Sequence, residues 1–214
     1  MKEIQKKLTV VNRTIARNRR KDWIVVHYVG SVSTAENNVI YFFDKDRKSS
    51  AHYFVDENEI WQCVDDSNIA WHVGGAKEYF NDCRNQNSIG VEMCCKKNEA
   101  GELYIDEQTI ANTIELVRYL MDKYGIDADH VVRHYDVSHK ICPAPFINDE
   151  SKWKNFKKGL VRVKEIKDVK TALDLLEKNG RVTDRGYWEK AILTTRNVDF
   201  LFIKWANDLQ KLLP

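Results

Sequence analysis

Short runs of β-branched and aromatic residues recur through the first 135 residues, and polar turns separate them. Such runs are typical of strands, because branched and aromatic side chains pack well on a half-buried sheet. The turn-forming stretch DENE joins the second run to the third and predicts a hairpin. The pattern therefore predicts five strands, at 23–29, 51–56, 59–64, 88–94 and 130–135.

A longer segment between the fourth and fifth strands has helical periodicity. Apolar residues recur every three or four positions from Ile110 to Tyr124, acids open the segment and Gly125 closes it. This predicts an amphipathic helix over 106–125. The strand, helix, strand order predicts a mixed α/β fold, in which helices flank a central, mostly β sheet.

Beyond about residue 160 the pattern becomes helical throughout. Apolar positions on one face of 169–179 end at Gly180, and two further helical stretches follow at 183–193 and 197–213. Three short helices indicate a small appended domain. We place the domains at 1–158 and 159–214, with a charged linker or connecting helix between them.

Composition adds limits to this outline. A chain of 214 residues, 43% hydrophobic and 31% charged, can bury one sizeable core and a small second one. Nowhere is there an apolar run of signal-peptide or membrane-spanning length, so we expect synthesis in the cytoplasm and no membrane insertion. Five cysteines without framework spacing, two of them adjacent, predict free thiols rather than a disulfide scaffold.

Charge is distributed unevenly. Residues 151–214 carry 15 Lys and Arg against 8 Asp and Glu, and residues 1–150 carry 19 against 24. The basic tail would suit an anionic partner, although lysines on solvated helix faces explain the same count. The acidic balance of the first 150 residues, without a basic recognition helix, argues against nucleic acid.

Two histidines and a cysteine follow strand-like runs. His27 ends "IVVH", His134 ends "HVVRH", and Cys142 comes after the next loop. Each histidine taken alone is more often a structural residue. Together, two imidazoles and a thiolate suit zinc, and three protein ligands leave a fourth tetrahedral position open, as in catalytic sites.

Three further residues could complete a hydrolytic site. Glu92 lies among apolar neighbours on a strand, where burial would raise its pKa into a range useful for acid–base catalysis. The alternative is a solvent-facing glutamate. Lys140 and His52 are candidates for stabilising an oxyanion. Taken alone, they would be a surface lysine and a structural sheet histidine.

Five stretches carry a family resemblance: "IVVHYVG", "SAHYFVD", "AWHVGG", "NQNSIGVEMC" and "RHYDVSHKICPAPF". In this order they resemble the zinc-dependent N-acetylmuramoyl-L-alanine amidases of the type 2 class. That class includes amidase-type phage lysozymes and is related to the peptidoglycan recognition proteins. The resemblance covers roughly residues 20–157.

The resemblance implies a role for each matching residue. It implies a Zn²⁺ site with His27, His134 and Cys142 as ligands. It makes Glu92 the catalytic glutamate and Lys140 the oxyanion-stabilising lysine, and His52 falls where some relatives carry tyrosine. The rim of the substrate groove would include Trp71, His72 and Asn87. The implied reaction is hydrolysis of the amide between N-acetylmuramic acid and L-alanine in peptidoglycan.

The same resemblance suggests a biological setting. A zinc hydrolase without an export signal but with an appended domain suggests a phage or prophage endolysin, made in the cytoplasm and released through a membrane pore to lyse a Gram-positive wall. The C-terminal helices would bind anionic wall polymers or form a homodimer. The alternatives are a cytoplasmic muropeptide-recycling amidase and a non-catalytic peptidoglycan-recognition module, although receptor relatives commonly lose the cysteine that Cys142 represents.

Overall fold

The computed structural model describes residues 1–74, 78–161, 166–194 and 198–213. The chain forms two compact units, 1–161 and 162–214. Helix α5 (Glu150–Leu160), which the expected boundary at 158/159 would cut, belongs entirely to the first unit. The expected start of the last helix, at 197, lies outside the described residues.

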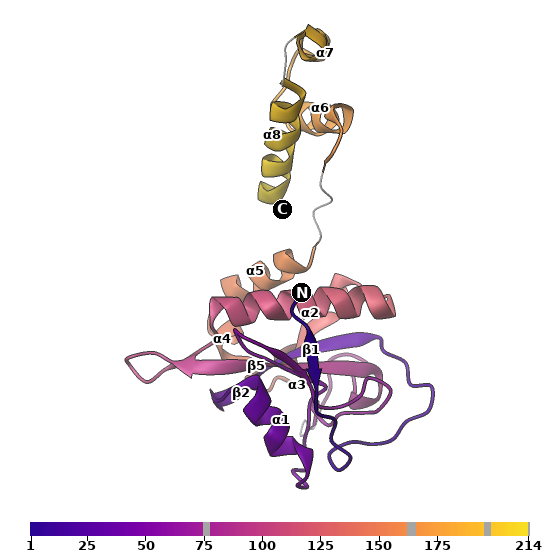
Figure 1. Cartoon of the computed structure of the whole chain (residues 1–214), viewed down its shortest axis with the longest axis vertical. Coiled ribbons are helices and arrows are strands. Elements are labelled where there is room, and N and C mark those ends of the chain that lie inside the picture. The colour runs from indigo at the N-terminus through magenta and orange to yellow at the C-terminus, as the bar shows by residue number, and fades with distance from the viewer. Residues whose placement is uncertain (75–77, 162–165, 195–197, 214) are drawn as a thin grey trace. The chain divides into compact units, whose positions relative to one another are not determined.

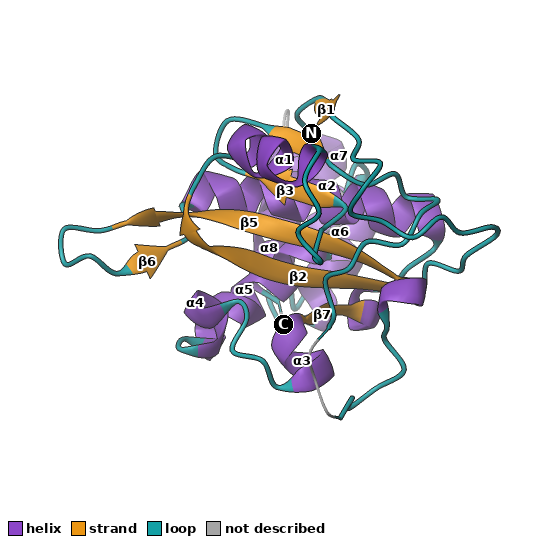
Figure 2. Cartoon of the chain, turned by 90° about the horizontal axis from the view of Figure 1, so that it is seen from below, coloured by secondary structure: helices purple, strands orange, loops and turns teal. Residues whose placement is uncertain are grey.

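One sheet of seven strands organises the described part of the first unit. Its order is β1-β4-β3-β5-β2-β7, and β6 pairs with β5. The long strands β2 and β5 are parallel neighbours at its centre, with Val26 opposite Val91 (Figure 2). The strands are β1 (Ile4–Lys6), β2 (Trp23–Val32), β3 (Tyr53–Val55), β4 (Ile60–Gln62), β5 (Ser88–Lys97), β6 (Leu103–Tyr104) and β7 (Val131–Arg133).

The sheet confirms the five predicted strands and the hairpin, because β3 and β4 pair antiparallel across the DENE turn. It adds the short strands β1 and β6, which the sequence pattern did not reveal. The fifth predicted strand is shorter than expected. It ends at Arg133, and His134 already begins helix α3 (His134–Ser138).

Helices cover both faces of the sheet (Figure 1). Helix α2 (Glu107–Tyr124) confirms the predicted amphipathic helix: the Asp106 side chain accepts from the Gln108 amide, and Gly125, at φ 67°, ends the helix. Helices α2 and α5 pack on one face, and α1 (Ala35–Phe43), which was not predicted, covers the other. Helix α4 (Ala144–Ile147) and short 3₁₀ turns at Asn85–Asn87 and Ala128–His130 complete the unit.

Alternation along the central strands decides which side chains can reach the site. Val26 and Val91 point into the core beneath α2. Because successive strand residues point to opposite faces, their neighbours His27 and Glu92 point away from that core. The two residues are also register partners on β2 and β5, which places both on the same face side by side.

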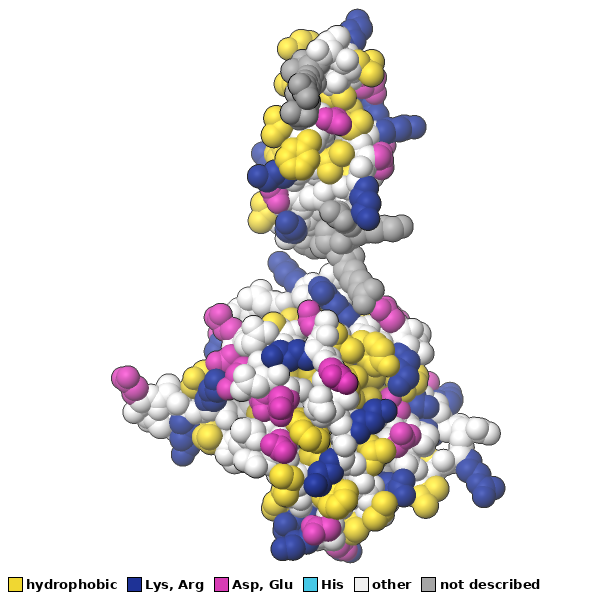
Figure 3. Space-filling view, in the orientation of Figure 1, with side chains coloured by type: hydrophobic (Ala, Val, Ile, Leu, Met, Phe, Trp, Pro, Cys, Tyr) yellow, Lys and Arg dark blue, Asp and Glu magenta, His cyan; other side chains and the backbone are white. Residues whose placement is uncertain are grey.

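The second unit is a small helical assembly. Its helices are α6 (Val169–Lys178), α7 (Arg185–Thr194) and α8 (Val198–Leu212). They share a core that includes Leu173, Leu176 and Phe202, so the three predicted helices are confirmed. Other apolar side chains remain on its surface (Figure 3). Phe200 is 63% exposed and Trp205 is 44% exposed.

No helix in the described ranges combines the length and apolar character needed to span a membrane.

Candidate metal centre

His27, His134 and Cys142 converge on the face of the sheet opposite α2. Each offers one ligand atom, and these atoms lie within 4.8 Å of one another. All three side chains are buried. The parallel pairing of β2 with β7 sets Val26 opposite Arg133, so the residues that follow, His27 and His134, become neighbours. The Cys142 carbonyl accepts from the Tyr135 amide at 3.0 Å, which ties its loop to the start of α3.

The convergence agrees with the sequence analysis, but the expected position of His27 is wrong. His27 is not at a strand end, because β2 continues five residues further to Val32. The β2–β5 register shifts between Tyr28 and Val32, just beyond the histidine. An irregularity of this kind redirects side chains beside a site.

The cluster satisfies two tests for a metal site. Both ring nitrogens of His134 are buried and have no hydrogen-bond partner within the described residues. Buried polar atoms without a partner cost free energy, and a cation would satisfy one of them. The donor set of two imidazoles and one thiol also consists of ligand types that zinc binds, and three protein ligands leave one coordination position open, as in catalytic zinc sites. These residues therefore fit a zinc ion.

A chain of hydrogen bonds assigns the tautomer of His27. The Ser88 hydroxyl donates to the Arg84 carbonyl at 2.6 Å, so its oxygen is left to accept from Nε2 of His72 at 3.2 Å. Nδ1 of His72 must then accept from Nε2 of His27, at 3.0 Å. The lone pair of His27 is thereby left on Nδ1, which lies 3.7 Å from Sγ of Cys142. A metal ligand needs this arrangement.

Glu92 and Lys140 share a cavity of about 360 Å³ with the three candidate ligands. Oε2 of Glu92 is buried and has no hydrogen-bond partner in the described chain. Burial raises the pKa of Glu92 to about 7, although the charge of Lys140 opposes this rise. A carboxyl group in that range can both accept and return a proton near neutral pH.

Trp71 and His72 line the same cavity, as the sequence analysis expected for the groove rim. The Trp71 indole donates to the Thr14 hydroxyl at 2.9 Å, which holds the ring in place. His72 packs against β5 at Gly90, where an added Cβ would lie only 2.6 Å from Cγ of the imidazole. The glycine therefore makes room for the histidine.

His52 does not line this cavity. It is fully buried, its Nδ1 accepts from the Gly90 amide at 3.0 Å, and its Nε2 donates to the Asn68 carbonyl at 3.3 Å. Burial lowers its pKa to about 3, so the ring is neutral. Its position is that of a structural histidine rather than of an oxyanion-stabilising group.

Asn87 also lies away from the cavity, at the start of β5. Its side chain accepts from the Arg84 amide at 2.7 Å and donates to the Asp82 carbonyl. Asn85 of the same "NQNS" motif contributes instead, because its Oδ1 accepts from the amides of His72, at 3.0 Å, and Val73. Asn85 and Ser88 were not predicted as hydrogen-bond partners of His72, although the motif contains both.

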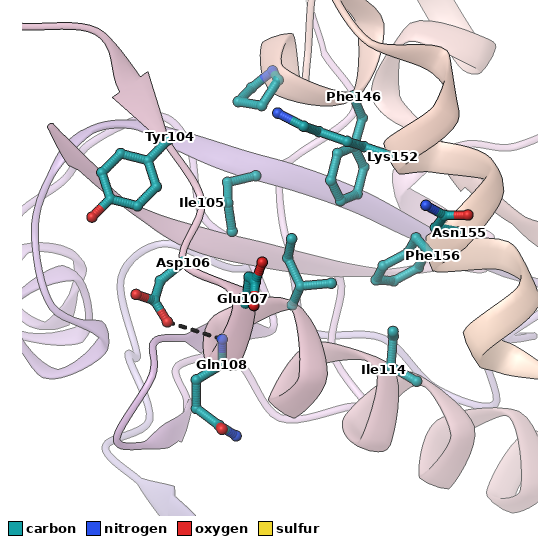
Figure 4. Close-up of a pocket in the computed structure, with 12 residues that line it drawn as sticks. Tyr104, Ile105, Asp106, Glu107, Gln108, Ile114, Phe146, Lys152, Asn155 and Phe156 are labelled. Atoms are coloured by element: carbon teal, nitrogen blue, oxygen red, sulfur yellow. Dashed lines mark hydrogen bonds between the residues drawn. The ribbon is translucent and has the colours of Figure 1, made fainter. Parts of the chain in front are cut away.

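A larger cavity of about 840 Å³ lies elsewhere in the first unit, between the start of α2 and helices α4 and α5 (Figure 4). Ile114, Phe146 and Phe156 give it an apolar wall, and it shares no lining residue with the metal cavity. It has no histidine or cysteine in its wall. Size alone therefore does not mark the reactive site.

The fold and this site define a class of protein: a mixed α/β sheet that carries a three-residue candidate metal centre beside a buried carboxyl group. Residues 17–145 match the sequence model of the N-acetylmuramoyl-L-alanine amidase family. The chain belongs to this family.

The named relatives of this chain are N-acetylmuramoyl-L-alanine amidases. The N-acetylmuramoyl-L-alanine amidase CwlL of Bacillus licheniformis is 35% identical over 145 residues, which cover 63% of this chain and 39% of the relative. The amidase BlyA of Bacillus subtilis is 33% identical over 147 residues, which cover 62% of this chain and 39% of BlyA. The chain thus spans about two fifths of the length of these curated relatives.

Solved structures share the fold of the first unit. PlyL is 27% identical with a TM-score of 0.64, and the match covers 76% of this chain and 99% of PlyL. A mutant endolysin from Bacillus subtilis is 27% identical with a TM-score of 0.60, and the match covers 75% of this chain and 100% of the endolysin chain.

Proposed function

We propose that this chain is a zinc-dependent amidase that hydrolyses the bond between N-acetylmuramic acid and L-alanine in peptidoglycan. One observation carries the proposal: the ligand atoms of His27, His134 and Cys142 gather within 4.8 Å beside the buried carboxyl group of Glu92. Family membership and the names of the relatives support the same reaction.

Each residue of the cavity has a separate task. A zinc ion held by His27, His134 and Cys142 would polarise the scissile carbonyl and lower the pKa of a water molecule. Glu92 accepts the proton that the attacking water loses and passes it to the amine of L-alanine as the C–N bond breaks. Lys140, on the cavity wall, neutralises the negative charge that develops on the carbonyl oxygen.

His52 and Asn87 have no part in this proposal, since neither lines the cavity. Trp71 remains a candidate for substrate contact because its half-buried ring forms part of the cavity wall. His72 is better assigned to positioning His27, to which it is hydrogen-bonded.

We further propose that the protein is a phage or prophage endolysin acting on a Gram-positive wall. The likeness to an endolysin from Bacillus subtilis and the Bacillus sources of the named relatives support this setting. A muropeptide-recycling amidase would use the same chemistry on a soluble substrate. A recognition module without turnover is disfavoured, because the three candidate ligands and Glu92 are all present.

The decisive experiment is release of free L-alanine amino termini from purified Gram-positive peptidoglycan, with and without a zinc chelator. We expect release that the chelator abolishes and added zinc restores, and no release by Cys142→Ser. Binding to peptidoglycan without new amino termini would instead make the chain a recognition module. Faster turnover of soluble muropeptides than of whole walls would favour recycling.

A further inference from the structure

A groove of about 460 Å³ on the first unit is lined by arginines. Among the described residues, four arginines face it together with Gln86 and Asn87, and none of the residues in its wall is acidic. It shares no lining residue with the metal cavity. The arginines are Arg17, Arg19, Arg20 and Arg84.

Three of these arginines come from a segment of concentrated positive charge. Residues 4–21 contain seven Lys and Arg and no Asp or Glu. The segment is held against the unit, because the Thr14 and Ile69 amides and carbonyls pair in both directions at 3.0 and 2.9 Å, and the Asp22 amide donates to the Asn87 carbonyl. Its charges therefore have defined positions.

The charge expected in the tail is located differently. Residues 151–161 contain four lysines and no acid, and all four lysines lie within α5 of the first unit. The second unit, 162–214, carries 11 Lys and Arg against 8 Asp and Glu, a net +3. Arg185 is also paired with Asp174, Glu177 and Glu189. The arginine groove is thus a better anion site than the second unit.

Two guanidinium groups of the groove are oriented without being neutralised. Arg19 donates to the carbonyls of Asn85, at 3.3 Å, and Ser88, at 2.7 Å. Arg84 donates to the carbonyls of Asn81 and Cys83 at 2.7 Å and stacks on Tyr79. Carbonyl and aromatic partners fix a guanidinium without neutralising it, and Asp66 acts on Arg19 only through its charge, without an ion pair between these two described residues.

The other two guanidinium groups are accessible. Arg20 pairs with Asp22 at 2.9 Å, yet its side chain is 73% exposed. Arg17 is exposed and has no hydrogen bond or ion pair within the described residues. Burial lowers the pKa of Arg19 to about 10, which still leaves that group charged at neutral pH. Nε of Arg19 is buried and has no hydrogen-bond partner among the residues that the structure describes.

We propose that the arginine groove binds a phosphodiester polymer of the cell wall. Guanidinium groups match phosphate oxygens in charge and geometry, and several of them along an open groove suit a repeating anion better than a single carboxylate. The choice of a wall polymer rests on the proposed function. Nucleic acid, the other phosphodiester polymer, is an outcome of the test.

The groove lies beside the start of β5, and the metal cavity lies further along the same strand. Asn87 precedes the first residue of β5, whereas Glu92 is five positions after Asn87, roughly 16 Å along an extended strand at about 3.3 Å per residue. A polymer bound in the groove would therefore leave the metal cavity free. Its effect would be to keep the enzyme on the wall between successive cuts.

The test compares two double variants of the full chain with the same change in charge. Arg17→Gln/Arg20→Gln removes the two accessible groups of the groove. Lys154→Gln/Lys158→Gln removes two exposed lysines from α5 and is the matched control. Thermal unfolding of each variant shows that the fold is kept. Binding is then measured on intact Gram-positive walls, on walls stripped of phosphodiester polymer, and on duplex DNA, across a range of salt concentrations.

We expect the arginine variant to bind intact walls about tenfold more weakly at moderate salt, with a salt dependence reduced by about one to two in the log–log slope. The lysine control should change by less than about twofold, and stripped walls should bind all proteins equally weakly. Equal losses in both variants, or equal binding to stripped and intact walls, would overturn the proposal. Tighter binding to DNA would assign the groove to nucleic acid instead.

Peptidoglycan hydrolysis is measured in parallel, so that the two proposals can fail separately. Groove-dependent binding to wall phosphate in a chain that releases no L-alanine termini would uphold the groove and refute the amidase. Hydrolysis without groove-dependent binding would uphold the amidase and refute the groove.

Discussion

His72 shows how one residue outside the candidate ligand set can control a metal site. Its Nδ1 accepts a hydrogen bond from Nε2 of His27, and its own Nε2 donates to the Ser88 hydroxyl. The lone pair on Nδ1 of His27 is therefore free for a cation. Partners of this kind keep a ligand in the correct tautomer and orientation. We therefore expect His72→Phe to bind zinc about 10- to 100-fold more weakly than the wild type, measured by competition with a chromogenic chelator.

His52 supplies the matched control for that prediction. It is also a buried histidine, it directly precedes strand β3, and both of its ring nitrogens bond to main-chain groups. His52→Phe should lower the unfolding temperature yet leave zinc affinity within about twofold. Equal losses of zinc affinity in the two variants would show that His72 acts only through stability.

A separate prediction concerns the side chain of Glu92. Because Gln keeps the size of the side chain but cannot accept a proton, Glu92→Gln should retain zinc and lose about 100-fold or more in amidase rate. Stoichiometric zinc measured beside the rate distinguishes this from metal loss. A rate near that of the wild type would remove Glu92 from the mechanism.

The raised pKa of Glu92 also sets a pH dependence. Only the ionised carboxylate can act as the base, so the wild-type rate should fall as the pH decreases through the pKa, which burial places at about 7. A cation in the cluster would favour the carboxylate and move this fall to lower pH. The measurement is the amidase rate on soluble muropeptides at pH values from about 4 to about 8. A rate independent of pH across this interval would contradict the assignment.

At the scale of elements, strand β5 supports the site through both of its faces. One face packs Val91 and Met93 into the main core, and the other carries Glu92 and receives the ring of His72 at Gly90. A β-carbon at position 90 would collide with that ring. We expect Gly90→Ala to destabilise the fold by about 1–3 kcal/mol and to weaken zinc binding by displacing His72.

Gly74 provides the control for this substitution, since an added Cβ there meets no atom of the described residues within 4 Å. Gly74→Ala should leave both the unfolding free energy, from urea denaturation, and zinc affinity nearly unchanged. If Gly90→Ala behaved in the same way, the close packing of His72 on β5 would not matter to the site.

At the scale of the whole molecule, helix α5 marks where the first unit ends. Trp153, Phe156 and Leu160 of this helix are part of the main core. Truncation after residue 161 should therefore leave a folded unit that hydrolyses soluble muropeptides at an unchanged rate. Truncation after residue 149 removes those three side chains and should prevent folding, since loss of one large buried side chain already costs about 3–5 kcal/mol.

The same pair of truncations tests the second unit. Far-ultraviolet circular dichroism and thermal unfolding report folding, and pelleting with whole walls reports wall affinity. If the protein ending at residue 161 binds walls as tightly as the full chain, the second unit has another role, such as pairing with a second copy through exposed residues like Phe200 and Trp205.

Much of this protein could be read from local pattern. Runs of β-branched and aromatic residues marked the central strands, and helical spacing and caps marked α2 and the three helices of the second unit. The family motifs pointed to His27, His134, Cys142 and Glu92. These features depend on neighbours close in sequence, or on motifs that keep their order. They can therefore be predicted without knowledge of the fold.

Tertiary structure alone decided the rest. It placed His27 within a strand and not at its end, and it buried His52 away from the cavity. It also placed Asn87, expected at the groove rim, outside the cavity, and made Asn85 and Ser88 the partners that hold His72. It also assigned α5 and its lysines to the first unit. The physical reason is that strand register, burial and hydrogen-bond partners arise between residues far apart in the chain, so no local pattern encodes them.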